Sequence, residues 1–380
     1  MADLQDYHVS VEMRTFPDPS QFAQRLQEAA YKGYDGALMV PPEGEQALSE
    51  MIQQLELGRM KVVTMTTDLD HRSRLFSVQS NGRVAGAMAG ELLGTVLGPG
   101  RNVALVTGQL TSWVHSRTAQ GFMEEVTRQG LCFAGVYEHH DLPSRAYLLA
   151  EQLLSEHPDL EGIYLATANS VTFCNHLVEL GYAGKIRIVA SDIFPQMIEF
   201  VRSGLVLATI FQNPFMQGRL ATRYLFEYLV EGRRFEETEI LLDPQIVLRS
   251  NLELYEKKLV TYPRTDARVL SSAVAKEIHK NLNGLMKYEA AVPFLQDILA
   301  MGSYKGLEKT RYVNDKQITD HYAIVPTGQG MGSLKSLSGL SAQVYDVIVH
   351  RFLAIFYPPA VYQKVALTVK IGEESLFFQL

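Results

Sequence analysis

Residues 186–211 read IRIVASDIFPQMIEFVRSGLVLATIF, and this stretch decides the fold of the first two thirds of the chain. Apolar runs at Ile186–Ser191 and Leu207–Phe211 predict two buried strands, and Pro195–Arg202 between them predicts a helix. A strand that returns to a neighbouring strand through a helix is typical of a parallel sheet with both faces covered.

The same alternation of apolar runs and amphipathic segments extends outward through residues 1–250. Further strands are predicted at His8–Arg14, Gly36–Val40, Lys61–Met65, Leu75–Gln79, Asn102–Thr107, Phe133–Glu138 and Gly162–Ala166. Further helices are predicted at Pro19–Lys32, Asn81–Leu97, Arg117–Gln129, Ser144–Glu156, Val171–Leu180 and Met216–Glu231. The sequence therefore predicts a doubly wound α/β fold for this part of the chain.

The composition is that of a globular protein, with 380 residues, 47% hydrophobic and 20% charged. No apolar run is long enough to predict a membrane span, and the acidic, polar start does not resemble a signal peptide. Cys132 and Cys174 lie in apolar surroundings without metal-ligand spacing, which favours buried reduced thiols and a cytoplasmic location. His139-His140-Asp141 is not predicted to bind a metal, because neighbouring strand-end residues point to opposite faces.

The charge is divided unevenly along the chain. Residues 1–250 contain 20 Lys and Arg against 30 Asp and Glu, a net charge of −10. The remaining residues contain 15 against 12, a net charge of +3. A nucleic-acid partner is therefore electrostatically unfavourable for the first part and compatible with the second.

Polar side chains follow the predicted strands at their carboxyl ends, where doubly wound sheets bind ligands. These residues are Asp68, Arg117, Asn169, Asp192 and Gln212. Carboxylate, amide and guanidinium groups suit the paired hydroxyls of a sugar or polyol. Each residue taken alone is also a common loop or helix-cap residue, so the prediction of a ligand site rests on all five together.

Four strings within this region carry a resemblance to a known family. They are TTDLDHRSRLFSVQSNGRVAGAMAGELL from Thr66, VTGQLTSWVHSRTAQGFMEEV from Val106, DLEGIYLATAN from Asp159 and RIVASDIFPQMIEFVRSGLVLATIFQNP from Arg187. They resemble the ligand-binding domain of lac-repressor-type regulators and the related periplasmic sugar-binding proteins, over about residues 5–255. The resemblance implies two α/β lobes around a sugar, which the five strand-end residues contact. It leaves Trp113 as either a stacking face for the sugar or a core residue.

The first part departs from this family at its start. No helix-turn-helix domain precedes it, and the first strand and most of the first helix are missing, so that His8–Arg14 matches strand two. Because strand one of the family lies between strands two and three, we expect a split sheet in the first lobe. That sheet would have two unpaired apolar edges and an incomplete sugar site. A homodimer through this domain stays open.

Residues 259–266 read LVTYPRTD and suggest a different chemistry. A short apolar strand leads to Tyr262 in a loop stiffened by Pro263, and Arg264 stands two residues after the tyrosine. A tyrosine hydroxyl is a poor nucleophile at its ordinary pKa of about 10. A neighbouring cation stabilises the charge that develops when it attacks a phosphodiester. By spacing alone, the string is equally a plain turn.

A second resemblance covers this string. LYEKKLVTYPRTDARVL from Leu254 and ITDHYAIVPTG from Ile318 resemble type IA DNA topoisomerases, and their topoisomerase III branch in particular. The resemblance implies that Tyr262 is the nucleophile that forms a 5′-phosphotyrosyl link with DNA. It implies that Arg264 contacts the scissile phosphate and that His321 lies beside the site.

The remaining positions of these motifs match the family in part. Thr265, Asp266 and Thr327 match supporting positions, whereas Ala267 and Tyr322 depart from the usual residues. The family implies single-stranded DNA as a partner and Mg²⁺ as a cofactor. Its acidic Mg²⁺-binding domain lies upstream of the tyrosine, and residues 1–250 contain no paired-aspartate motif of that kind. We therefore expect no metal ligands in this chain and no strand cleavage by the tyrosine fragment alone.

The sequence around the tyrosine predicts a mainly helical domain fragment. SSAVAKEIHKNLNGL from Ser271 and the segment Gln343–Phe356 carry apolar residues at helical spacing, so His350 is predicted to be structural. VALTVKIGEESLFFQL from Val365 alternates like a strand. The glycine-rich GQGMGSLK at 328–335 lacks the G-K-[ST] signature and is not predicted to cradle a phosphate.

Both resemblances include Leu252–Glu256, and no flexible linker separates them. We expect a sugar-binding domain at residues 1–252 and a topoisomerase tyrosine-domain fragment at 253–380. Two origins of the join stay open. One is recombination or a mis-joined gene model, and the other is a selected fusion. The predicted function is that of a DNA-binding topoisomerase fragment, inactive alone, attached to a sugar sensor. The alternative is a sugar- or polyol-binding module of the transcription-regulator type with a non-functional tail.

Overall fold

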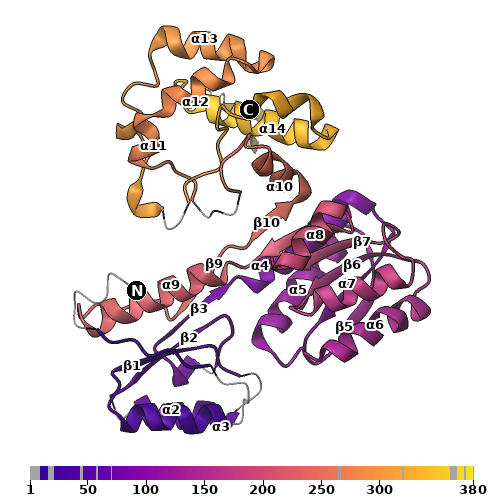
Figure 1. Ribbon diagram of the computed structural model, residues 1–380, viewed down its shortest axis with the longest axis vertical. Coiled ribbons are helices and arrows are strands. Elements are labelled where there is room, and N and C mark those ends of the chain that lie inside the picture. The colour runs from indigo at the N-terminus through magenta and orange to yellow at the C-terminus, as the bar shows by residue number, and fades with distance from the viewer. Residues whose placement is uncertain are drawn as a thin grey trace. The chain divides into compact units, whose positions relative to one another are not determined.

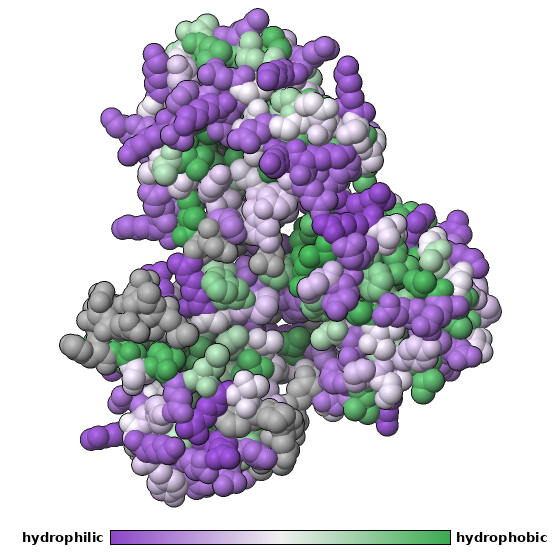
Figure 2. All heavy atoms as spheres, viewed as in Figure 1, coloured by the Kyte–Doolittle hydropathy of each residue, from purple (hydrophilic) through white to green (hydrophobic). Residues whose placement is uncertain are grey.

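The structure is a computed structural model that describes residues 9–15, 21–42, 46–56, 59–69, 71–263, 265, 267–318, 321–359, 366–371 and 374–379. The chain divides into two compact units, residues 1–249 and residues 250–380. The first unit contains two α/β lobes and the second is mainly helical (Figure 1). In the view of Figure 2, hydrophilic side chains spread over the surface of both units.

The first lobe of unit 1 is a parallel sheet covered on both faces by helices. Its strand order is β1 (Gly36–Met39), β2 (Lys61–Met65), β3 (Phe76–Ser80) and β9 (Glu239–Leu242). Helices α2 (Phe22–Tyr31) and α3 (Gln46–Glu56) share one core with Val62, and α9 (Pro214–Leu229) shares the other with Val63. Adjacent strand residues point to opposite faces, which explains the run of apolar residues in β2.

The second lobe is a larger sheet with the order β10-β8-β7-β6-β4-β5. The strands are β4 (Asn102–Thr107), β5 (Cys132–Glu138), β6 (Leu160–Ala166), β7 (Arg187–Ser191), β8 (Val206–Phe211) and β10 (Gln245–Leu248). Only β10 is antiparallel to its neighbour among these six strands. The helices are α4 (Gly82–Leu97), α5 (Trp113–Arg128), α6 (Pro143–Glu156), α7 (Ser170–Glu179) and α8 (Pro195–Ser203).

Helices α4 and α5 approach each other closely because glycines line their contact. A Cβ atom added at Gly86 would lie 2.0 Å from the carbonyl oxygen of Thr118, and one at Gly121 would lie 1.9 Å from that of Arg83. Neither position has room for a side chain. The glycine-containing face of α4 is thus a helix-packing face.

The chain crosses between the lobes three times within unit 1. It leaves the first lobe after β3, returns after β8 through α9 and β9, and enters the second lobe again as β10. This connectivity confirms the predicted two-lobed, doubly wound architecture.

Several local predictions were wrong. Residues 9–14 form no strand, and β1, β2, β3 and β9 form one continuous sheet, so the expected split of the first lobe does not occur in the part that the structure describes. Helix α3 and the short strands β9 and β10 were not predicted. Cys132, expected to be buried, is exposed, whereas Cys174 is buried as predicted.

Helix α10 (Arg249–Glu256) starts directly after the last residue of β10, and from Ser250 on it belongs to unit 2. The elements that follow are α11 (Ser272–Lys276), α12 (Ile278–Leu285), η3 (Glu289–Ala291), α13 (Val292–Met301), η4 (Leu307–Lys309), η5 (Asp315–Gln317), η6 (Met331–Ser336), α14 (Gly339–Ala354) and the antiparallel hairpin β11 (Ala366–Ile371) and β12 (Glu374–Gln379). Leu254 of α10 is fully buried in the same core as Leu282, Tyr345 and Val349. The segment that both resemblances include therefore packs as part of unit 2.

The glycine-rich segment 328–335 is a packing loop. A Cβ atom added at Gly284 of α12 would lie 2.2 Å from the carbonyl oxygen of Gly328, and one at Gly330 would lie 2.1 Å from that of Lys257. Gly328 and Gly330 also have positive φ angles of 73° and 67°, which glycine adopts without strain. The glycines thus allow close backbone contact with two neighbouring elements.

Candidate functional site

The loop that carries Tyr262 begins where α10 ends. Leu259 and Val260 are buried in the core of unit 2, and Val260 forms an antiparallel bridge with Pro326. These two anchored residues fix the direction of the backbone, so that Thr261 and Tyr262 leave the core at a defined point. The side chain of Tyr262 is partly buried.

Two threonines fasten this loop to the segment around His321. Thr261 Oγ1 donates to the carbonyl oxygen of Ala323 at 3.1 Å and accepts from the backbone N–H of Val325 at 3.0 Å. Thr265 Oγ1 donates to the carbonyl oxygen of His321 at 2.7 Å. In all three bonds the partner is a backbone atom of the segment around His321. These bonds therefore hold together two motifs that are far apart in the sequence, since Thr261 and Ala323 are separated by 62 residues.

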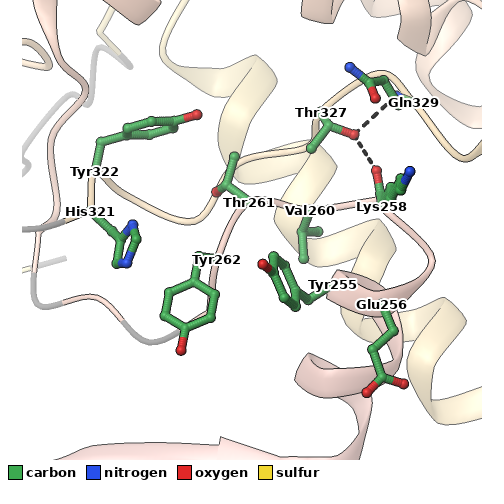
Figure 3. A pocket seen from close by; sticks show the side chains of 10 residues that line it. All are labelled: Tyr255, Glu256, Lys258, Val260, Thr261, Tyr262, His321, Tyr322, Thr327 and Gln329. Carbon is green, nitrogen blue, oxygen red and sulfur yellow. Dashed lines mark hydrogen bonds between the residues drawn. The ribbon is translucent and has the colours of Figure 1, made fainter.

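Tyr262 lies between two other rings. The centroid of the His321 ring is 4.5 Å away, and that of the Tyr255 ring is 5.1 Å away in an edge-to-face arrangement (Figure 3). Contacts of this kind contribute about 0.5–1.5 kcal/mol each beyond the burial of area. The structure therefore brings together the predicted nucleophile and the predicted histidine and restricts the position of the tyrosine ring.

A cavity of about 470 Å³ lies at these rings. It is lined by Tyr255, Glu256, Lys258, Val260, Thr261, Tyr262, His321, Tyr322, Thr327 and Gln329. Burial raises the pKa of the Tyr322 phenol, so this group stays neutral at physiological pH. Aromatic faces combined with one ammonium group and one amide are typical of surfaces on which unpaired nucleotides stack.

The other residues predicted for the tyrosine motif include Thr327, Arg264 and Asp266. Thr327 has a structural role, because its Oγ1 donates to the carbonyl oxygen of Lys258 at 2.5 Å and accepts from the backbone N–H of Gln329 at 3.0 Å (Figure 3). Arg264, predicted to contact the scissile phosphate, and Asp266 lie outside the described residues.

Two of the predicted sugar contacts lie together at the carboxyl ends of β7 and β8. The backbone N–H of Gln212 donates to Asp192 Oδ1 at 2.9 Å, and Gln212 Nε2 donates to Asp192 Oδ2 at 3.0 Å. Burial raises the pKa of the Asp192 carboxyl, although the bonds from Gln212 act in the opposite direction. The backbone of Asp192 is left-handed, with a φ of 62°, which is unusual for a residue other than glycine.

Of the other three predicted sugar contacts, Asp68 and Arg117 form ion pairs with other residues of unit 1, and Asn169 does not. Asp68 forms a two-pronged ion pair with Arg74, both at 2.5 Å, and both side chains are almost fully buried. Arg117 forms an ion pair with Glu239 of β9 at 2.6 Å and lies over the exposed ring of Trp113. Asn169 precedes α7 and makes no capping bond with its side chain.

A family model described as periplasmic binding protein domain matches residues 1–233, which is more than half of the chain. The chain belongs to the periplasmic binding protein domain family. A second model, described as DNA topoisomerase, matches residues 239–379. This member of the family thus joins a sugar-binding-type domain to a topoisomerase fragment.

Solved structures of sugar-binding proteins share the fold of the periplasmic binding protein part. A glucose-galactose binding protein from Geobacillus stearothermophilus is 22% identical, with a TM-score of 0.60 over 66% of this chain and 90% of that chain. A sugar-binding protein of a sugar ABC transporter from Bacillus halodurans is 20% identical, with a TM-score of 0.60 over 67% and 92%. At these identities the likeness shows the fold alone.

The curated relatives match the topoisomerase fragment. DNA topoisomerase 3 of Bacillus subtilis is 40% identical over 126 residues, 32% of this chain and 16% of that protein. DNA topoisomerase 3 of Staphylococcus saprophyticus is 32% identical over 140 residues, 36% and 19% of the two chains. The chain thus spans less than a fifth of the length of these relatives.

The described side chains around Tyr262 do not fit the Mg²⁺ site that the topoisomerase family implies. Among the described residues that line the cavity, Glu256 is the only carboxylate and His321 is the only imidazole. Mg²⁺ takes oxygen ligands in octahedral geometry. Within the described part of the chain, no group of three or more His, Cys, Asp or Glu residues could hold a metal ion.

None of the helices that the structure describes is long and apolar enough to cross a membrane.

Sequence reasoning missed four residues of these two sites. Arg74 and Glu239 pair with predicted sugar contacts, and Tyr255 and Lys258 line the tyrosine cavity. Only Tyr255 had a local signal, since it is the second-last residue of α10 and therefore lies near the loop that follows. The pairing of Glu239 depends on β9, a strand that the sequence did not reveal.

Proposed function

We propose that unit 2 binds single-stranded DNA and uses Tyr262 as the nucleophile of type IA strand cleavage. The observation that carries this proposal is the contact between the Tyr262 and His321 rings, at 4.5 Å, within a fragment similar to topoisomerase 3. In the proposed step, Tyr262 Oη forms a bond to a backbone phosphorus and the bond from that phosphorus to the 3′ oxygen breaks. The tyrosine loses its proton, and the released 3′ oxygen takes one up.

We further propose that the chain does not relax supercoiled DNA on its own. Among the described residues that line the cavity, Lys258 is the only lysine or arginine and Glu256 is the only carboxylate that could help to hold a metal ion, whereas a developing phosphoryl charge needs several preorganised positive groups or metal ions. The relatives that carry the full activity are more than five times the length of the matched segment. Strand cleavage would then require another chain that supplies the missing groups.

Two assays on the purified full chain test this proposal. A fluorescein-labelled DNA strand of about 12 nucleotides should bind, as followed by anisotropy, and the binding should weaken as salt rises. Supercoiled plasmid with Mg²⁺ should stay supercoiled. Lack of binding to the single strand would refute the DNA-binding proposal. Robust relaxation that the Tyr262→Phe variant abolishes would refute the proposed inactivity and support the nucleophile.

A second function, binding of a sugar or polyol by unit 1, is favoured by the pair at the ends of β7 and β8. Asp192 and Gln212 come from neighbouring strands and hold each other at 2.9–3.0 Å, with the exposed ring of Trp113 in the same lobe. Such amide and carboxylate groups match adjacent sugar hydroxyls. Calorimetry against pentoses, hexoses and polyols tests this function, and no heat across a broad panel with folded protein would count against it.

A further inference from the structure

Helix α10 ends in a conformation that usually requires glycine. The backbone N–H of Lys258 donates to the carbonyl oxygen of Tyr255 at 2.8 Å, and that of Leu259 donates to Leu254 at 2.9 Å. This pair of bonds is the Schellman motif, in which the first residue after the cap is left-handed. Lys258 occupies that position with a φ of 58°.

The same chain places glycine at comparable helix ends. Helix α8 ends at Gly204, with a φ of 82°, and helix α13 ends at Gly302, with a φ of 63°. A left-handed conformation is strained for lysine because its Cβ lies too close to the following carbonyl oxygen. A strained residue persists where the surrounding structure holds it in place, and such residues cluster at functional sites.

Two adjacent lysines at this helix end have different surroundings. Lys257 Nζ is held by Glu253 Oε1 at 2.8 Å and by the carbonyl oxygen of Ser336 at 2.8 Å. Lys258 is exposed, lines the Tyr262 cavity and has no ion pair with any residue that the structure describes. Lys257 therefore stabilises the fold, whereas the ammonium group of Lys258 is available to a ligand of the cavity.

The backbone of Lys258 is held firmly in place. Its carbonyl oxygen accepts the bond from Thr327 Oγ1, and Gly330 packs against the carbonyl oxygen of Lys257 with no room for a Cβ atom. Figure 3 shows Lys258 and Thr327 on one wall of the cavity and Tyr262 on the other side of Val260. The charged side chain thus starts from a fixed point on the wall of the cavity that Tyr262 also lines.

We propose that Lys258 is a phosphate-contacting residue of the Tyr262 cavity, kept in a strained backbone conformation that glycine would relieve. This assignment rests on the proposed binding of single-stranded DNA by unit 2. The ammonium group is a compact cation with three donors, which suits a backbone phosphate next to the nucleotide in the cavity. A bound phosphate also releases counterions, which makes the contact measurable through its dependence on salt.

The test uses Lys258→Gly in the full chain, because glycine removes the ammonium group and the strain together. By calorimetry, the melting temperature of unit 2 should rise by about 3–5 °C. Affinity for a labelled single strand at about 0.1 M salt should fall about fivefold, and the slope of log K against log salt should become shallower by about 0.7. Lys258→Arg should keep the affinity within about twofold, because it keeps the charge.

Lys305 is the matched control, since it is an exposed lysine of the same unit that does not line the cavity. Lys305→Met should leave the affinity and the salt slope unchanged. Wild-type affinity and slope in Lys258→Gly, or an equal loss in Lys305→Met, would overturn the role of Lys258 while the proposed function stands. A melting temperature that falls in Lys258→Gly would overturn the strain argument. If the unaltered chain binds no single strand, the proposed function and this assignment fail together.

Discussion

Glu253→Gln should destabilise unit 2 and reduce the loss of its stability at acid pH. Glu253 accepts bonds from Lys257 Nζ at 2.8 Å, Ser341 Oγ at 2.5 Å and Ser338 Oγ at 3.2 Å. Although burial alone would raise it, these bonds lower the pKa of Glu253 to about 2, from an ordinary value of 4.5. This difference between folded and unfolded chains corresponds to about 3 kcal/mol at neutral pH. Partial exposure of the Glu253 and Lys257 side chains, 20% and 25%, screens the pair and reduces this to about 2 kcal/mol.

The lowered pKa sets the sign of the pH dependence. Because the folded pKa lies below the unfolded one, the stabilisation is fully present above about pH 5 and is lost as the pH falls from about 4.5 toward 2. Urea unfolding of the full chain, followed by hydrogen exchange in α10 and α14, should show this loss in the wild type and a smaller loss in Glu253→Gln.

Glu277 provides the control, because it forms an ion pair with Lys280 in which both side chains are more than 60% exposed. Glu277→Gln should not change the stability measurably, since exposed pairs contribute little. The reasoning about Glu253 is refuted if Glu253→Gln is as stable as the wild type at pH 7. It is also refuted if both proteins lose stability equally between pH 5 and 3.

Three further predictions concern packing and charge. Gly330→Ala should lower the free energy of unfolding by at least about 2 kcal/mol, because its Cβ would meet a backbone oxygen at 2.1 Å. The control Gly332→Ala has open space around it and should change the free energy of unfolding by under about 0.5 kcal/mol. Asp192→Asn should raise the melting temperature of unit 1 at pH 7, because burial raises the pKa of this carboxyl and so disfavours its charged form, and calorimetry should show weaker sugar binding. The stability of the wild type should correspondingly rise as the pH falls through that pKa, and a lower melting temperature in Asp192→Asn would contradict this account. Arg74→Met should cost about 3–5 kcal/mol in urea unfolding, because it leaves the buried Asp68 carboxylate without its counter-charge, and a loss under about 1 kcal/mol would contradict that role.

The sequence predicts the second lobe well because its central strands are buried on both faces. Strands β4 and β6 are buried at all but one residue each and have apolar centres, so their pattern needs no information about partners. Strands β9 and β10 have only four residues each and lie at sheet edges, where pairing with distant strands decides the structure. For residues 9–14 the error was the reverse, because a strand was predicted that the structure does not contain. An alternating pattern without a partner strand does not form a strand.

The candidate sites show the same contrast between residues that a local sequence pattern identifies and residues whose role depends on distant partners. Tyr262 and His321 belong to motifs with fixed spacing, and the backbone bonds of Thr261 and Thr265 then bring them together. The partner of Asp68 could not be predicted, because Arg74 reaches it only after β2 and β3 pair. Lys258 could not be predicted either, since its positive φ angle is visible only once the end of α10 is known.

The join between the two units also follows from particular residues. Val247 of β10 is buried in unit 1, Leu254 of α10 is fully buried in the core of unit 2, and no irregular residue separates the strand from the helix. Here both elements next to the join are held by their own units, strand β10 by its ladder with β8 and helix α10 by the bonds of Glu253. The chain is therefore ordered on both sides of residue 249, and the segment Leu252–Glu256, which both resemblances include, is part of helix α10 in unit 2.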